Sequence, residues 1–281
     1  MPLWQGNNPI AFGPASIKSL VAWYDVSSAS TDVSDKVTVW KDKTSFENHL
    51  VRDTDVLNTN TFTSSNATIF NNQAIYRNSK LLEFQTPLSA ITVFCVASVD
   101  ATLAATTANL QDGYISNILS VFINTIHTQN PNDCNTNMTF GVIHLNTGLP
   151  IPLIYDNTFT GITNSALSPI SDDLRAFKIW TGVTNRPFDD SMYLYLNGNS
   201  VQQGGVITPQ SINSFNIFLG DSLNLTPSST TPASNHNGVI SYKEVIIYST
   251  RLPESDISKI HLYLQEKYNL GPLANGGVFQ Y

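Results

Sequence analysis

Side chains that could act as acids, bases or nucleophiles are sparse in this sequence of 281 residues. Retaining hydrolysis of a glycosidic bond needs two carboxyls about 5 Å apart, and residues two apart on a strand share one sheet face. The nearest match is Glu254-Ser255-Asp256, which stands at a predicted helix start and lacks a second glutamate. The remaining glutamates are Glu47, Glu83, Glu244 and Glu266. We therefore predict that the chain is not an enzyme.

Other catalytic and cofactor-binding patterns are also missing from the sequence. It has no G-x-S-x-G turn, no H-E-x-x-H helix and no glycine-rich phosphate or dinucleotide loop. Cys95, in an apolar run, and Cys134, in a polar one, form neither a disulfide framework nor a zinc site, and Cys95 is expected to be buried. Metal-ligand spacing is absent among the histidines, which are His49, His127, His144, His236 and His261. No cofactor is therefore expected.

The composition is poor in ions and rich in small polar side chains. Charged residues make up 12% of the chain, about half the usual globular share, whereas Asn, Ser and Thr account for 86 residues. The 14 basic and 21 acidic side chains leave a net charge of -7, so no basic surface for phosphates is expected. The composition excludes nucleic acid as a partner and favours a surface of hydroxyls and amides.

No segment has the pattern of a leader or a membrane anchor. The opening residues, MPLWQGNNPIAFGP, contain neither the basic segment nor the apolar run of a signal peptide. The longest apolar run, ITVFCVASV at 91–99, is the size of a strand and much shorter than the ~20 residues of a membrane span. We therefore expect synthesis in the cytoplasm and no membrane span.

Short apolar or alternating runs recur along the chain, separated by polar segments rich in turn residues. They cover 19–26, 36–42, 81–84, 91–99, 115–124, 138–145, 176–184, 191–201, 214–220 and 239–250. In one of them, Asn197-Gly198 follows an alternating run and predicts a hairpin, because a type I′ turn needs positive φ at both central positions. Without alternating long helices, this pattern predicts an all-β, two-sheet antiparallel sandwich.

One segment, 252–270, has helical periodicity. Pro253 and two acids suit its first turn, and Asn269 with Gly271-Pro272 ends it. We interpret His261 as a surface or boundary residue. The apolar face predicted to pack on the sandwich consists of Ile257, Ile260, Leu264 and Tyr268. The chain is therefore expected to carry one C-terminal helix.

Three motifs follow one another along the chain. They are LVAWYDVSSAS (20–30) with KVTVWKDKTSFENHL (36–50), then YLYLNGNSV (193–201), then GVISYKEVIIYSTRLPESDISKIHLYLQEKYNL (238–270). Together they resemble the concanavalin A-like lectin/glucanase superfamily, in the laminin-G-like jelly-roll form found in phage and large-virus proteins. The resemblance implies a lectin-like jelly roll over roughly 15–270, made of two curved antiparallel sheets packed face to face.

The sequence departs from that family in two ways. Thr44-Ser45-Phe46-Glu47 stands where the family usually has a Gly-Asn-Gly turn, so this loop is expected to be built differently. The E-x-D-x-E motif of the glucanase members, and its bulged form, are absent. Because other members are lectins, adhesion modules or inert particle components, the fold alone leaves the function open.

The resemblance also raises two kinds of binding site. Rim calcium in such sandwiches is held by Asp, Asn and main-chain oxygens, although the candidate aspartates serve equally well as turn caps. These candidates are Asp53, Asp55, Asp172, Asp173, Asp189, Asp190 and Asp221. A glycan would need an aromatic platform surrounded by polar groups. Trp23 and Trp40 are predicted to be core, whereas Trp4 and Trp180 are candidate contacts, together with Asn235 and His236.

The chain is expected to contain an N-terminal arm (1–14), a jelly-roll domain (15–270) and a C-terminal tail (271–281). The favoured hypothesis is a non-catalytic structural protein of a virus or phage particle, a minor capsid or surface component. Its arms would bind other structural proteins, and its final location would be the virion. The alternative is a carbohydrate-binding adhesin that recognises glycans through rim loops 226–238 and 128–137. A glycoside hydrolase ranks third, because the carboxyl pair is missing.

Overall fold

The computed structural model describes residues 12–31, 33, 37–52, 68–71, 76–78, 82–88, 90–100, 114–123, 136–144, 151–155, 173–184, 192–204, 212–219 and 239–271. A short 3-10 turn, η1 (Pro14–Ser16), precedes the first strand, and one helix, α1 (Glu254–Tyr268), follows the last. The strands are β1 (Leu20–Thr31), β2 (Val37–Asp42), β3 (Leu50–Arg52), β4 (Thr68–Asn71), β5 (Tyr76–Asn78), β6 (Leu82–Leu88), β7 (Thr92–Asp100), β8 (Tyr114–Ile123), β9 (Thr136–His144), β10 (Ile151–Tyr155), β11 (Lys178–Thr184), β12 (Met192–Leu196), β13 (Asn199–Gly204), β14 (Ile212–Leu219) and β15 (Val239–Tyr248).

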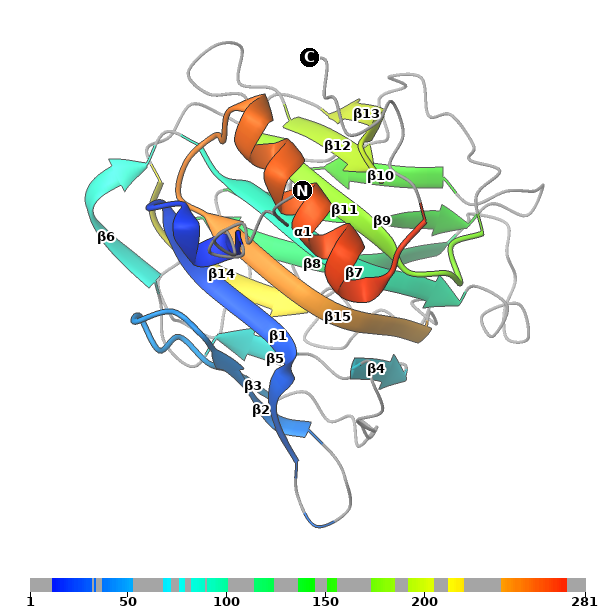
Figure 1. Ribbon diagram of the computed structural model, residues 1–281, viewed down its shortest axis with the longest axis horizontal. Helices are drawn as coiled ribbons and strands as arrows, with labels where there is room; N and C mark the ends of the chain where they lie inside the picture. The colour runs from blue at the N-terminus through cyan, green and yellow to red at the C-terminus, as the bar shows by residue number, and fades with distance from the viewer. Residues whose placement is uncertain are drawn as a thin grey trace, which may run out of the picture.

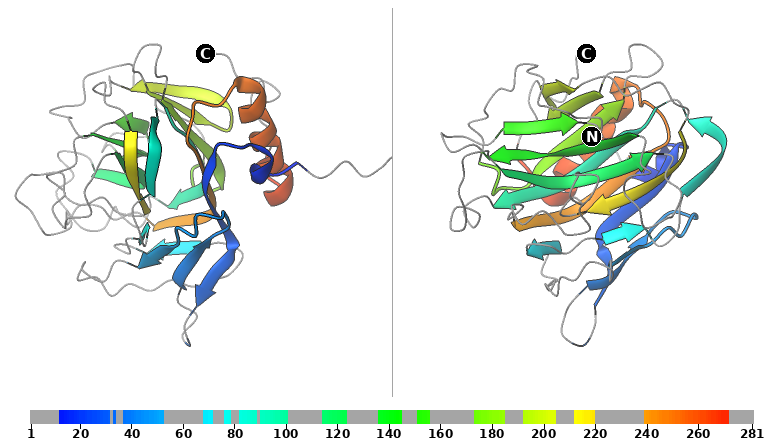
Figure 2. Two further views of the ribbon diagram at one scale, coloured as in Figure 1. Left: turned by 90° about the vertical axis from the view of Figure 1, so that its left-hand side faces the viewer. Right: turned by 180° about the vertical axis from the view of Figure 1, so that it is seen from behind.

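The strands form one antiparallel hydrogen-bonded path that doubles back into two layers. Its order is β10-β9-β8-β14-β5-β3-β2-β1-β15-β7-β11-β12-β13, with β4 added to β15 and β6 to β14. Figure 1 shows α1 lying across one layer, and Figure 2 shows that layer facing the other, with α1 on its outside. The predicted two-sheet antiparallel sandwich with one C-terminal helix is confirmed.

Strand alternation gives the helix-covered layer two buried faces. On β7, Val93, Cys95 and Ala97 point into the inner core between the layers, whereas Phe94 and Val96 point outward. The outward side chains join those of α1 in a second cluster, which we call the helix-side cluster. It comprises Phe94, Val96, Ile179, Val183, Tyr195, Ile246, Tyr248, Leu252, Ile257, Ile260 and Leu264. Burial on both faces explains why these strands are almost continuously apolar.

The hairpin between β12 and β13 forms as predicted. Asn197 and Gly198 both have positive φ, 49° and 85°, the values that a type I′ turn requires. The Asn197 side chain also accepts the backbone N–H of Ile179 at 2.9 Å, which ties the turn to β11. The turn thereby fixes the pairing of β12 with β13.

Helix α1 begins later than its sequence pattern indicates. Pro253 is the N-cap and not a first-turn residue, and Asn269 ends the helix in the left-handed conformation with φ 49°. The prediction for His261 is wrong, because this side chain is fully buried with Nε2 2.8 Å from Thr181 Oγ1. Its place follows from helical spacing, since His261 lies one turn from both Ile257 and Leu264.

The helix of the described residues is not long and apolar enough to cross a membrane. Each predicted strand is present. Four strands that are five residues long or shorter were not predicted, namely β3, β4, β5 and β10. Cys95 is buried as predicted, whereas Cys134 lies outside the described residues. The expected arms also lie outside them, apart from Phe12, Gly13 and Pro14 at one end and Gly271 at the other.

Candidate functional site

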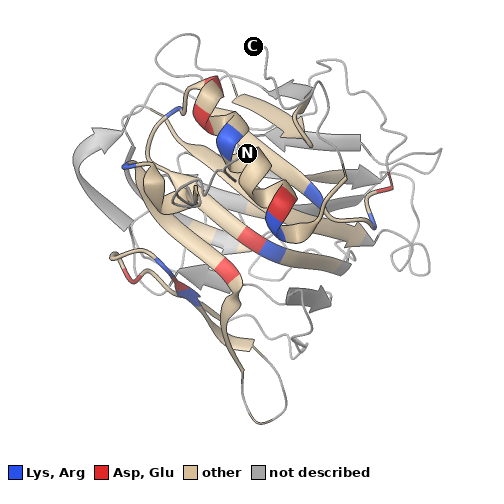
Figure 3. Ribbon diagram, viewed as in Figure 1, with Lys and Arg blue, Asp and Glu red and all other residues tan. Residues whose placement is uncertain are grey.

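Two carboxylates lie opposite each other on the layer that α1 covers. Asp25 on β1 and Glu244 on β15 are cross-strand partners in the antiparallel register. Their side chains are only 5% and 0% exposed. Figure 3 shows acidic and basic residues gathered where α1 crosses β15, with an acidic residue on the adjacent part of β1. The fold therefore forms a carboxylate pair that the linear spacing of the sequence does not contain.

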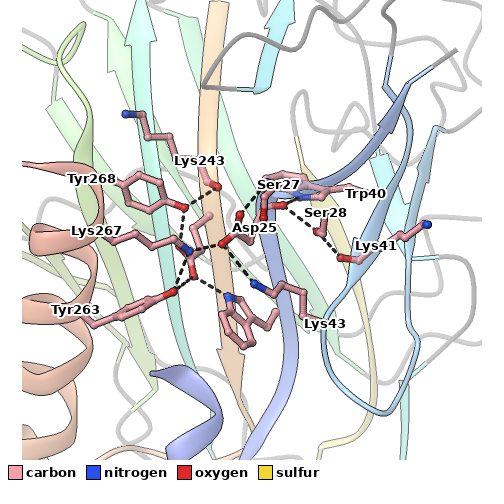
Figure 4. A network of polar contacts seen from close by, with 12 residues as sticks. Asp25, Ser27, Ser28, Trp40, Lys41, Lys43, Lys243, Tyr263, Lys267 and Tyr268 are labelled. Carbon is pink, nitrogen blue, oxygen red and sulfur yellow. Dashed lines mark hydrogen bonds and ion pairs between the residues drawn. The ribbon is translucent and has the colours of Figure 1, made fainter. Parts of the chain in front are cut away.

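Lys267, in the last turn of α1, connects both carboxylates to the helix. Its Nζ donates to Glu244 Oε2 at 2.7 Å, to Asp25 Oδ2, and to the Tyr263 hydroxyl at 2.8 Å. Figure 4 shows these three acceptors converging on the ammonium group. We call Asp25, Glu244 and Lys267 the helix clasp, because they join α1 to β1 and β15.

The Glu244 carboxylate accepts three further hydrogen bonds from aromatic side chains. Trp23 Nε1 donates to Oε1 at 2.6 Å, Tyr263 OH to Oε1 at 3.0 Å, and Tyr268 OH to Oε2 at 2.6 Å. Both oxygens are thus fully occupied by donors, as a buried carboxylate requires.

A second lysine balances the charge at the helix clasp. Lys43 Nζ lies 3.5 Å from Asp25 Oδ2 and 4.0 Å from the centre of the Trp23 ring, where it forms a cation–π contact. Two carboxylates therefore face two ammonium groups in one network. A balanced set of this kind lowers the cost of burying each charge.

The surroundings shift the ionisation of these groups. Burial raises the pKa of the Asp25 carboxyl, but hydrogen bonds from Lys267 and from Ser27 outweigh burial and lower the pKa to about 2. Burial lowers the pKa of Lys267, but the Glu244 charge and the hydrogen bonds raise it above its usual range. Burial, followed by the Glu244 charge, raises the pKa values of Tyr263 and Tyr268. Asp25 and Lys267 are therefore ionised at neutral pH, and Tyr263 and Tyr268 are neutral.

This arrangement suits holding a helix more than performing a reaction. A glycosidase pair needs one protonated and one accessible ionised carboxyl flanking its substrate. Here the Asp25 pKa is far below neutral, and Glu244 has no exposed surface. Within the described ranges, no group of three or more His, Cys, Asp or Glu could hold a metal ion. The clasp closes this face of the sandwich.

A buried aspartate organises the loop of residues 43–49, which joins β2 to β3 and which we call the β2–β3 loop. Asp42 Oδ1 accepts the backbone N–H groups of Trp23 and Thr44, each at 3.0 Å. Its Oδ2 accepts the Thr44 hydroxyl at 2.6 Å and the backbone N–H of Asn48 at 3.0 Å. The Tyr24 hydroxyl donates to the carbonyl of Asn48 at 2.6 Å. Both ends of the loop are thus tied to the sandwich.

The tip of this loop contains the departure from the family pattern. Ser45, Phe46 and Glu47 are all exposed, and Glu47 has a φ of 51°, in the left-handed region. A glycine adopts that conformation without steric cost. Glu47 is therefore a non-glycine residue in a glycine-like conformation, and the expectation that this loop differs from the family's stays a prediction.

The predicted contact residues are not brought together in the described part of the chain. Trp4, Asn235 and His236 lie outside it. Trp180 is fully buried in the inner core, where its Nε1 donates to the carbonyl of Ala97 at 3.3 Å. The prediction of Trp180 as a ligand contact is corrected accordingly, because a ring without exposed surface offers no platform. On β11 its side chain alternates inward while Ile179 and Thr181 point to the helix.

The other tryptophans occupy two different environments. Trp40 is fully buried in the inner core, as predicted, and donates to the carbonyl of Asp25 at 2.6 Å. Trp23 was also predicted to be core, but it is only partly buried and packs against the helix-side cluster. Trp23 therefore belongs to the outer face of its layer.

One of the aspartates proposed for calcium lies in the described residues. Asp173 accepts a hydrogen bond from the backbone N–H of Arg175 at 3.1 Å and another from the Arg175 side-chain Nε at 2.9 Å. Its carboxylate therefore caps a turn, the other role that the sequence allowed for it. Asp53, Asp55, Asp172, Asp189, Asp190 and Asp221 lie outside the described part of the chain. Calcium at those positions stays a prediction.

Sequence reasoning missed the three residues of the helix clasp. Each of them nevertheless lies inside a segment that carries the family resemblance: Asp25 in WYD, Glu244 in KEVIIY and Lys267 in QEKYNL. A polar residue within an otherwise apolar strand, such as Glu244, was the available signal. Its partner could not be identified without the pairing of β1 with β15.

Comparisons with known proteins show the fold. No family model matches the chain, and no curated protein does. Trypanosoma rangeli sialidase in complex with a difluoro-KDN is 14% identical with a TM-score of 0.51, over 89% of this chain and 33% of that one. The same sialidase with 2,3-difluorosialic acid is 15% identical with a TM-score of 0.50 and the same coverage. The ligand-binding domain of botulinum neurotoxin serotype D, in complex with N-acetylneuraminic acid, is 12% identical with a TM-score of 0.48, over 89% and 52%.

The chain spans about a third of the sialidase and about half of the neurotoxin domain. At these identities the likeness concerns the fold alone. Together with the two antiparallel layers around an inner core, the likeness to the sialidase shows that this chain folds as a β-sandwich of the concanavalin A-like type.

Proposed function

We propose that this chain is a non-catalytic, carbohydrate-binding domain that recognises glycans at the rim of its sandwich. The observation that carries the proposal is the closed state of the helix-covered face. The carboxylate pair of that face, Asp25 and Glu244, is neutralised by lysines and buried under α1. Hydrolysis therefore lacks an accessible acid and an accessible nucleophile on that face.

The surface chemistry of the chain supports a sugar as the ligand. Sugar hydroxyls are recognised by amide, hydroxyl and carboxylate groups placed around an apolar contact. Asn, Ser and Thr are abundant here and the chain has few ions. Such a surface pairs with neutral polar ligands without the desolvation cost of charged groups.

A glycan array with the full chain tests this proposal. We expect selective hits. The array should include sialylated probes, because the sialidase of the comparison was solved with a difluorosialic acid. The double variant Asn235→Ala/His236→Ala should lose them if the 226–238 loop makes the contact. A matched control, Ser255→Ala/Lys259→Ala, changes polar residues of α1 outside any rim loop and should bind as the parent does. An array without hits for folded protein would overturn the proposal.

The role as a structural component of a virus or phage particle stays a prediction. It rests on the arms 1–14 and 271–281, most of which lie outside the described residues. Deletion of 1–11 or of 272–281 should prevent incorporation into a particle while the domain still folds. Normal incorporation of both deleted forms would contradict it. The glycan-binding proposal does not depend on that outcome.

A further inference from the structure

The β2–β3 loop exposes a phenylalanine at the rim of the sandwich. Phe46 is 44% exposed, and Val33 and Leu262 are the other exposed large apolar residues of the described ranges. The loop lies at the lower left in Figure 1, where it joins β2 to β3. A single exposed apolar residue is common on protein surfaces, but Phe46 differs in how its loop is held.

Hydrogen bonds of the buried residues Asp42, Asn48 and Tyr24 hold the backbone of the loop. Asp42 binds Thr44 and Asn48 on either side of the tip, and the Phe46 backbone N–H donates to Thr44 Oγ1 at 3.3 Å. Tyr24, which is fully buried, fixes the carbonyl of Asn48. The Phe46 ring is therefore presented on an ordered backbone, and ligand binding does not incur the entropy cost of ordering the loop.

The residue after Phe46 adopts a conformation that costs stability. The non-glycine residues with positive φ in the described ranges are Glu47, Asn197 and Asn269. Asparagine tolerates this region, whereas glutamate at such a position costs on the order of 1 kcal/mol. Two unfavourable features, an exposed apolar ring and a left-handed glutamate, thus stand at adjacent positions on one rigid loop. Strain of this kind gathers at binding sites.

We propose that Phe46 is the stacking platform of a carbohydrate site, with Glu47 and Ser45 as hydrogen-bonding groups beside it. The inference rests on the proposed glycan-binding function and gives it a location. A pyranose ring has an apolar C–H face and a polar edge. It therefore matches one aromatic ring with an exposed hydroxyl and an exposed carboxylate next to it.

The size of the apolar surface favours a sugar over a protein partner. A stable protein interface buries about 800 Å² on each side, and its central aromatic residues are surrounded by other well-packed contacts. The neighbours of Phe46 at the loop tip are polar, because Lys43, Ser45 and Glu47 are all exposed. One ring in polar surroundings is suited to a small amphipathic ligand.

The test compares Phe46→Ala with Leu262→Ala on the glycan array and by titration of the best glycan hit. Leu262 is 47% exposed and lies on α1, so it matches Phe46 in exposure at a distant place. We expect Phe46→Ala to weaken binding about tenfold, the loss of one stacking contact, and Phe46→Trp to retain it. Leu262→Ala should bind as the parent does. Equal urea midpoints for both alanine variants and the parent would show that folding is unchanged.

The possible failures are distinguishable. If the parent chain gives selective hits and Phe46→Ala binds them with unchanged affinity, the site at Phe46 is overturned and the glycan-binding function stands. Equal weakening by Phe46→Ala and Leu262→Ala also overturns it. An array without hits for folded parent protein overturns both the function and the site.

Discussion

Lys267 on α1 donates to Glu244 on β15 at 2.7 Å, across the interface between the helix and the sheet. Asp25, the cross-strand partner of Glu244, accepts from the same ammonium group. One lysine therefore satisfies two buried carboxylates and positions the last turn of the helix. The most conspicuous pair of acids on a sheet face serves to close that face.

Lys267→Met should destabilise the fold strongly. The change leaves Asp25 and Glu244 buried without their main counter-ion, and breaking a buried pair in this way costs about 3–5 kcal/mol. Urea unfolding measures the loss. The control is Lys259→Met, which removes an exposed partner of Asp256 and should cost about 1 kcal/mol or less. Equal effects of the two variants would refute the role of the clasp.

His261 should make the stability of the fold fall in mild acid. Burial lowers the pKa of His261 from 6.5 to about 3. The unfolded chain thus takes up a proton near pH 6.5 that the folded chain takes up only near pH 3. Between these values the unfolded state binds more protons, so stability is complete above pH 6.5 and falls with decreasing pH, by about 1.4 kcal/mol per unit.

The measurement for His261 is the free energy of unfolding at pH 7, 6 and 5. His261→Gln keeps a polar group for Thr181 but cannot titrate, so its curve should be flatter than that of the parent. Ser255→Ala, a change at an exposed residue of α1 that does not titrate, serves as the control and should keep the parent's slope. Parallel curves for the parent and His261→Gln would contradict the prediction.

Asp25 should titrate well below a normal aspartate. Its hydrogen bonds from Lys267 and Ser27 hold its pKa at about 2 against an ordinary value of 3.8. The contribution of this carboxyl to stability is therefore complete above about pH 5 and is lost as the pH falls through 2. Carboxyl carbon shifts followed by NMR give the midpoint directly. A midpoint at or above 3.8 would exclude the ionised clasp described here.

Glu47→Gly should stabilise the protein by about 1 kcal/mol. Glycine removes the steric cost of the left-handed conformation, which outweighs the greater freedom of glycine in the unfolded chain. Asn197→Gly is the matched comparison, since Asn197 has a similar φ but also accepts the N–H of Ile179. It should destabilise. Thermal unfolding of both variants checks the signs, and a loss of stability in Glu47→Gly would show that its conformation is not strained.

The strands and the helix were predictable because each carries a local signal. Alternation marked β12, Asn197-Gly198 marked its turn, and helical spacing marked Ile257 and Ile260. The same spacing also places His261 on the buried face of the helix. The prediction that His261 lies at the surface was wrong because it followed from the polarity of the side chain and not from its position on the helix. Polarity is a weak guide where a hydroxyl such as that of Thr181 can supply a hydrogen bond.

Trp180 shows a different limit of sequence reasoning. Its strand is apolar on both faces, because one face meets the inner core and the other meets α1. Alternation therefore gives no indication of which side chains are hidden, and a ligand platform and a core tryptophan have the same local pattern. The helix clasp was beyond local signals altogether, since Asp25 and Glu244 meet only through the pairing of β1 with β15.

We propose that this sandwich binds glycans and does not cleave them. Incubating the full chain with its best array hit, followed by mass spectrometry of bound and free glycan, tests both parts at once. We predict that the glycan is retained by the protein and recovered with its mass unchanged. Recovery of cleaved glycan, or no retention of any glycan by folded protein, would contradict the claim.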